Sequence, residues 1–174
     1  MFEDATRLTL ADGETVIIRR IRPDDETRLQ AMHRHLSRES VRLRFFTAFR
    51  ELSVGMAHKF ANVDFKHRAA FVVSGEGSDA IVGVGRYEES APRVAEVAFV
   101  MDDAYQGRGI GTVLLQIIAD CARTNGFRTL TAIALAENAP MLAVFRDSGF
   151  PTTITTDRDM RVITMQIAES PAPL

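Results

Sequence analysis

The segment AEVAFVMDDAYQGRGIG, residues 95–111, decides the fold of this chain because a strand, a glycine loop and a helix meet in it. The apolar run over residues 93–101 predicts a strand. Three glycines then stand at alternate positions in QGRGIG, residues 106–111. Beyond them, apolar residues recur at the i, i+3, i+4 and i+7 spacing of one helical face, which predicts an amphipathic helix that ends near Gly126.

The glycine loop suits the binding of a pyrophosphate-like group. Alternating glycines adopt positive φ without strain and let successive N–H groups point at one anion, and the following helix adds a positive N-terminal dipole. The GxGxG spacing differs from the Walker loop and from the GxGxxG dinucleotide fingerprint. We expect Arg108 to add a charge-assisted contact to phosphate. A turn that only connects strand and helix is the alternative. The candidate binding residues are Gln106, Gly107, Arg108, Gly109, Ile110, Gly111 and Thr112.

Periodicity along the rest of the chain predicts mixed α and β structure. Residues 38–61 favour a helix with an interruption, and a further helix is expected to begin at Asn138 and to stop at Gly149. A glycine-rich turn at 75–80 predicts a hairpin. This order of elements predicts a mixed sheet covered by helices. The other expected strands cover residues 14–21, 69–75, 80–89, 129–135, 150–156 and 160–168.

Composition predicts one globular domain over residues 1–170 with a frayed tail at 171–174. The 21 basic and 23 acidic residues give a formal charge of −2, which argues against the basic footprint of nucleic-acid-binding proteins. The acidic N-terminus argues against a signal peptide, and no apolar run is long enough for a membrane span. We therefore expect a cytoplasmic protein without nucleic-acid or membrane partners.

The sequence gives no indication of a metal site. Cys121 is the only cysteine, so neither an internal disulfide nor a cysteine-based zinc site can form within the chain. The four histidines show no HExxH or other ligand spacing. No metal is expected.

The loop at 106–111 and the segment NAPMLAVFRDSGF at 138–150 resemble the GNAT superfamily of N-acetyltransferases. The resemblance implies a mixed, mostly antiparallel central sheet of about seven strands flanked by about four helices. A narrower resemblance, to the acetyltransferase domain of Pat-type bacterial protein lysine acetyltransferases, is carried by residues 12–25, 36–46 and 95–111. Pat-type proteins often have a further regulatory domain, for which we expect no room in 174 residues.

The resemblance implies acetyl-CoA as co-substrate and assigns binding roles by position. Backbone groups of Phe99, Val100 and Met101 are expected to meet pantetheine and the thioester. Asn138 is expected to contact the CoA arm besides capping its helix, although capping alone would explain an asparagine there. The resemblance also places Arg42, Arg44 and Arg50 beside the acceptor groove.

Glu96 is the candidate general base. It interrupts an apolar strand, and alternation places it on one face with Ala98 and Val100. We expect partial burial, a raised pKa and proton uptake directly or through water. Pat-type enzymes use a glutamate at this place in the motif. A glutamate that is solvated, or paired with Arg93 or Arg86, is the alternative.

Phe145 stands where many family members have a tyrosine that protonates the leaving thiolate. Phenylalanine has no proton to donate, so the thiolate leaves unassisted or through water, or else Tyr105 or Tyr87 takes the role of the acid. The sequence therefore offers candidates that hold the pyrophosphate, stabilise the thioester oxygen and act as the base, but the acid for the leaving thiolate is in doubt.

The expected function is acetyl-CoA-dependent N-acetyl transfer to a primary amine by direct attack. The Pat-like segments favour a protein lysine, such as that of an acyl-CoA synthetase. Acetylation of a small amine or amino acid is one alternative, and a non-catalytic acyl-CoA-binding module is another, suggested by Phe145. A homodimer is compatible with the resemblance, although no motif specifies one, nor the acyl-chain preference.

Overall fold

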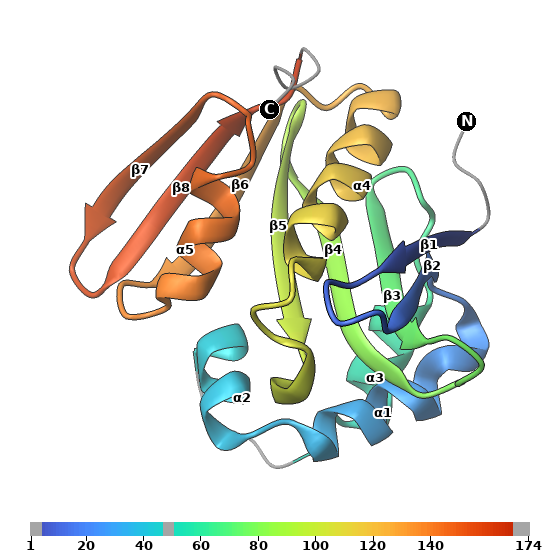
Figure 1. Cartoon of the computed structure of the whole chain (residues 1–174). Coiled ribbons are helices and arrows are strands. Elements are labelled where there is room, and N and C mark those ends of the chain that lie inside the picture. The colour runs from blue at the N-terminus through green and yellow to red at the C-terminus, as the bar shows by residue number, and fades with distance from the viewer. Residues whose placement is uncertain (1–4, 47–50, 169–174) are drawn as a thin grey trace.

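The computed structural model describes residues 5–46 and 51–168, in which eight strands form one sheet (Figure 1). The predicted tail at 171–174 and Arg50 lie outside the described residues. The strand order is β1-β2-β3-β4-β5-β6-β8-β7, and all neighbours are antiparallel except β5 and β6. The strands are β1 (Ala5–Thr9), β2 (Thr15–Arg20), β3 (Arg68–Gly75), β4 (Ile81–Ala91), β5 (Val94–Met101), β6 (Thr129–Leu135), β7 (Thr152–Asp157) and β8 (Met160–Gln166).

The described residues form five α-helices, one more than expected, because the stretch 38–61 divides into two. Ser37 and Ser53 each cap one of these two helices through a side-chain oxygen. The helices are α1 (Glu26–His35), α2 (Arg38–Phe45), α3 (Val54–Ala61), α4 (Ile110–Thr124) and α5 (Ala139–Arg146), with short 3-10 turns η1 (Pro23–Asp25) and η2 (Asp103–Tyr105). None of the described helices is long and apolar enough to cross a membrane.

The mixed, mostly antiparallel sheet expected from the sequence is confirmed, and helices cover both of its faces. Alternation along β5 turns Val97 and Phe99 into the core shared with α4 and α5. Val100, on the other face, packs against the core formed by α1, α3 and the neighbouring strands. Burying each large apolar side chain contributes roughly 1.5–3 kcal/mol. β5 is therefore held firmly from both sides.

The sheet splits between β5 and β6. These parallel strands pair only at Val94, Ala95 and Glu96, opposite residues 129–131. Beyond Glu96 the two strands diverge, although β6 stays paired with β8 along its whole length. The C-terminal half of β5 therefore borders an opening in the middle of the sheet.

Candidate active site

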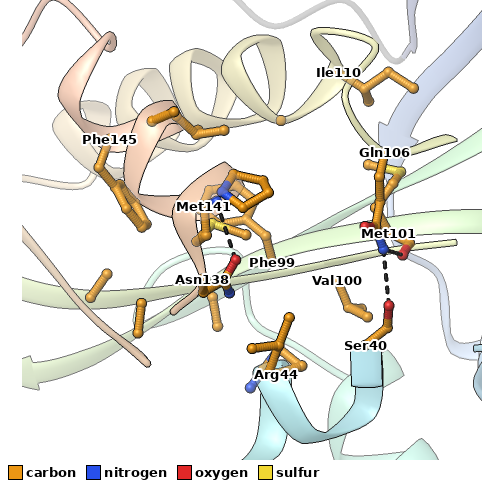
Figure 2. A pocket seen from close by; sticks show the side chains of 18 of the residues that line it. Ser40, Arg44, Phe99, Val100, Met101, Gln106, Ile110, Asn138, Met141 and Phe145 are labelled. Carbon is orange, nitrogen blue, oxygen red and sulfur yellow. Dashed lines mark hydrogen bonds between the residues drawn. The ribbon is translucent and has the colours of Figure 1, made fainter. Parts of the chain in front are cut away.

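A cavity of about 360 Å³ occupies this opening (Figure 2). Its walls come from the diverging halves of β5 and β6, the glycine loop, α5 and α2. The candidate base Glu96 and every residue that the sequence proposed as cofactor-binding line this one cavity, as far as Asn138. The fold thus brings together residues that lie more than forty positions apart, while their individual roles stay predictions.

The glycine loop has the geometry of an anion site. Gly107 and Gly109 have φ of +68° and +82°, a region that favours glycine, and a Cβ on either would meet nothing within 4 Å. Ile110, Gly111 and Thr112 form the first turn of α4, where amides have no acceptor within the helix. No acidic residue occupies that turn. The loop therefore leaves N–H groups and a positive helix end free for a pyrophosphate.

Gly111 has a different task. A Cβ at this position would lie 3.2 Å from Cγ2 of Val144, a residue of α5. The third glycine therefore lets α4 and α5 approach closely, and this fixes the two helices on either side of the cavity.

The side chain of Arg108 is held by the β1–β2 turn. Its Nη2 lies 2.5 Å from Oδ2 of Asp12 and 2.7 Å from Oε2 of Glu14, and its guanidinium stacks over the ring of Tyr105. These partners raise the pKa of Arg108, the hydrogen bond to Glu14 most of all. The expected contact with phosphate would require Arg108 to exchange partners, and it stays a prediction.

Gln106 joins the loop to α2. Its Nε2 donates to the carbonyl oxygen of Met101 and to Oγ of Ser40, both at 3.0 Å. Ser40 in turn donates to Asp103, which also accepts from the backbone and the hydroxyl of Ser37. This network fixes the start of α2 against the end of β5.

The backbone of β5 presents polar groups to the opening. The amide of Asp102 donates to the carbonyl oxygen of Val82 in β4, at 2.8 Å. Because hydrogen-bonding direction alternates in an antiparallel ladder, Val100 also turns its backbone to β4, whereas Phe99 and Met101 turn theirs to the opening. Val97 also turns its backbone away from β4, but its N–H belongs to the last step of the pairing with β6, where Glu96 lies opposite Thr131, and so it is not presented to the opening.

Glu96 stands at the point where β5 and β6 part. It shares the face of Ala98 and Val100, as expected, but partial burial is wrong because Glu96 is exposed. Within the described residues it forms no ion pair with Arg93 or Arg86, and β4 places Glu88 directly opposite. The guanidinium of Arg44 on α2 contributes the cationic field at its carboxylate.

Asn138 caps α5. Its Oδ1 accepts from the amide of Met141 at 3.3 Å, and the residue is buried at the cavity wall (Figure 2). Its Nδ2 donates to no other group in the described part of the chain, which leaves it available to a ligand. Phe145 is buried, and its ring meets Phe99 edge-on with centroids 5.9 Å apart.

Each of the two tyrosines donates its hydroxyl proton to another group of the protein, although Tyr105 lines the cavity. Tyr87 is buried in the core, donates to the carbonyl oxygen of Lys66, and has a pKa raised by burial. Tyr105 donates to Glu14 at 2.9 Å, and this hydrogen bond raises its pKa. Of the routes expected from the sequence, release without a side-chain acid fits this geometry. In residues 5–46 and 51–168, no cluster of three or more His, Cys, Asp or Glu side chains is arranged to hold a metal ion.

Comparison with known proteins agrees with this geometry. The model of the acetyltransferase (GNAT) family matches residues 29–150. Acetyltransferase PA5475 of Pseudomonas aeruginosa is 31% identical over 158 residues, which cover 89% of this chain and 85% of that protein. The crystal structure of the GNAT domain of S. lividans PAT superposes with a TM-score of 0.84 and 32% identity, over 93% of this chain and 96% of that one.

The similarity also extends to a longer protein. Acetyltransferase Pat of Mycolicibacterium smegmatis is 25% identical over 161 residues, which cover 91% of this chain and 47% of Pat. The chain thus spans about half the length of that relative.

Proposed function

The chain belongs to the acetyltransferase (GNAT) family, whose members use acetyl-CoA, and on this premise we propose that it acetylates the ε-amine of a protein lysine with Glu96 as general base. The observation that carries the proposal is the end of the β5–β6 pairing at Glu96. The opening that begins there joins the two faces of the sheet. A carboxylate thus stands on one face, and the anion-binding loop at the N-terminus of α4 lies at the other side of the same cavity.

The residues divide the reaction between them. Glu96 takes a proton from the acceptor ammonium, directly or through water, and the free amine attacks the thioester carbonyl carbon. Backbone N–H groups of Phe99 and Met101 face the opening and are suited to stabilise the negative charge on the carbonyl oxygen. The C–S bond then breaks, the nitrogen of the new amide gives up its second proton to water, and the CoA thiolate takes a proton from water. A thiol pKa of about 8.5 makes release without a tyrosine tolerable.

The lysine acceptor is supported by similarity to the GNAT domain of S. lividans PAT. An acyl-CoA synthetase is the proposed kind of target protein. A small amine or amino acid is the runner-up acceptor, because the loop and Asn138 recognise only the acyl donor. A second candidate function is an acyl-CoA-binding module without turnover. It is favoured by Phe145, which has no proton to donate to the leaving thiolate. Cytoplasmic location and a homodimer stay predictions.

The test compares acceptor pools under one assay. Acetyl-CoA consumption and free-thiol release are measured with purified acyl-CoA synthetases and with a panel of small amines. We expect turnover with the synthetases and an acetylated lysine in their mass spectra. Turnover with small amines alone would overturn the lysine acceptor, and CoA binding without turnover in either pool would favour the binding module.

A further inference from the structure

Two arginines lie together on the face of the sheet that carries Glu96. Arg86 of β4 stands opposite Ala98, the next residue of β5 on that face. Arg44 comes from the last turn of α2 and lines the main cavity on its α2 side (Figure 2). Arg44 and Arg86 also both line a smaller, mostly apolar cavity of about 40 Å³ beside it, next to Ala98 and Val100.

Within the part of the chain that the structure describes, neither guanidinium forms an ion pair with a carboxylate. The Nη2 of Arg86 donates to the carbonyl oxygen of Phe60 at 2.9 Å, and its guanidinium stacks 4.2 Å from the centroid of that ring. Arg44 stacks on Phe45, 4.7 Å from the ring centroid. Among residues 5–46 and 51–168, no Asp or Glu oxygen lies within 4 Å of a side-chain nitrogen of Arg44 or Arg86. Most of their hydrogen-bonding capacity is therefore unused.

This arrangement is unfavourable for the protein alone. Burial lowers the pKa of Arg44 to about 10, and burial together with the positive charge of Arg44 lowers the pKa of Arg86 to about 10. Both side chains are half-buried, and this burial disfavours their charged form, while no carboxylate of the described residues forms an ion pair that would offset it. A bound anion would remove the repulsion between them.

We propose that Arg44 and Arg86 form a subsite for a carboxylate carried by the acceptor, beside the amine that Glu96 deprotonates. The pair lies on the face of Glu96, away from the loop for the pyrophosphate, which assigns it to the acceptor rather than to CoA. Guanidinium groups match the planar carboxylate through paired hydrogen bonds. The small cavity exceeds the roughly 10–15 Å³ that one water needs, so it admits a group of a few heavy atoms.

The subsite deepens the proposed function and rests on it, since it specifies which amines are accepted. The carboxylate has two sources: an Asp or Glu near the target lysine, or the α-carboxylate of an amino acid. The test therefore uses two matched pairs of acceptors. One is a blocked peptide with lysine between two glutamates, against the same peptide with glutamines. The other is leucine against leucine amide.

We expect the wild type to prefer the carboxylate member of at least one pair by roughly tenfold or more in kcat/KM, since hydrogen bonds to charged groups contribute that much. The acceptor pair that shows the preference identifies the source of the carboxylate. Arg44→Gln and Arg86→Gln should each bring the ratio towards one. Arg38→Gln removes an exposed charge from the same helix and should keep the wild-type ratio. Equal loss on both members of a pair, with a shifted pH profile, would mean that Arg44 acts only on Glu96 and would overturn the subsite.

A binding measurement separates the subsite from the reaction. Fluorescence anisotropy of the two labelled peptides on the CoA complex reports affinity without turnover. Tighter binding of the glutamate peptide, lost in Arg44→Gln, would support the subsite even if no acceptor were acetylated, and only the proposed function would then fail. Turnover and binding that are equal for both members of each pair would overturn the subsite while leaving acetyl transfer intact.

Discussion

Two clusters of charge in this protein are wholly or partly buried, and they differ in whether the chain supplies their partners. Asp25, at the start of α1, has a fully buried side chain that accepts from both Nη1 and Nη2 of Arg19 at 2.8 and 2.9 Å. It also accepts from the amide of Arg22 at 2.8 Å. Arg44 and Arg86 have no such carboxylate among the described residues. We call Asp25 and Arg19 the satisfied cluster, because the chain itself supplies their partners. We call Arg44 and Arg86 the open cluster, because the described residues give them no ion-pair partner.

The contrast separates structural from functional charge. The ion pair of Asp25 with Arg19 joins the first helix to the end of β2, and it lies away from the cavity. Burial alone would raise the pKa of Asp25, but the hydrogen bonds from Arg19 and Arg22 outweigh it and lower the pKa. The open cluster lies beside the place that we propose for the acceptor. A charge that only holds the fold is expected to have its partners within the chain, and one that binds a ligand is expected to lack them.

The largest loss of stability is expected when the ion pair of the satisfied cluster is broken. Asp25→Ala leaves Arg19 as a partly buried cation without a counter-ion, which should lower the free energy of unfolding by about 3 kcal/mol or more. Asp24→Ala, which removes an exposed neighbouring carboxylate, serves as the control. Urea denaturation measures both variants. Similar midpoints for the two would show that the buried pair is not needed for stability.

The same cluster predicts a pH dependence. Because the pKa of Asp25 is lower in the folded state, its contribution to stability is fully present above the unfolded pKa of about 3.9 and is lost as the pH falls through the folded value. The free energy of unfolding should therefore decrease between pH 5 and pH 2 less steeply in Asp25→Asn than in the wild type. If the free energy of unfolding fell equally steeply with pH in both proteins, the assignment of this pH dependence to Asp25 would be contradicted.

Asn138 resembles the first cluster through one side-chain atom and the second cluster through another. Its Oδ1 accepts a hydrogen bond from the chain, whereas its Nδ2 donates none to the described residues. Asn138→Ala should lower the free energy of unfolding by about 1 kcal/mol through the lost cap. Asn138→Asp retains the capping oxygen and should restore most of that stability, while CoA affinity, measured by calorimetry, stays reduced in both variants. Full CoA affinity in either variant would leave capping as the only role.

The smallest effect on stability is expected from the open cluster. Arg44→Gln removes a cation that forms no ion pair with the described residues, so the free energy of unfolding should change by less than about 1 kcal/mol, in either direction. Urea denaturation alongside Asp25→Ala gives the direct contrast. A loss as large as that of Asp25→Ala would show that Arg44 is a structural residue.

Local patterns in the sequence predicted the parts of this fold that depend on neighbours along the chain. The spacing of apolar residues predicted α4, and alternation predicted the face of Glu96 on β5. The short edge strand β1 was missed because its burial alternates only between exposed and intermediate, so it has no strong apolar signal. Its strand character comes from the backbone ladder with β2.

The candidate site was predictable as a set of residues but not in its polar contacts. Arg108 donates a hydrogen bond to Glu14, which is 94 positions away in the sequence, and Gln106 donates one to Ser40, which is 66 positions away. The approach of Arg44 to Arg86 requires the register of β4 and the position of α2, which no local pattern contains. The sequence could name the candidate loop and the candidate base, whereas the proposed subsite required the folded chain.

The most direct test of the account is the comparison of Glu96→Gln with the wild type in two measurements on the same preparations, the kcat for acetyl transfer and the Kd for CoA. The account predicts that kcat falls by about 100-fold or more, since a general base contributes that much, while the Kd for CoA stays as it was. A variant that transfers acetyl groups at the wild-type rate would contradict the assignment of Glu96 as the base.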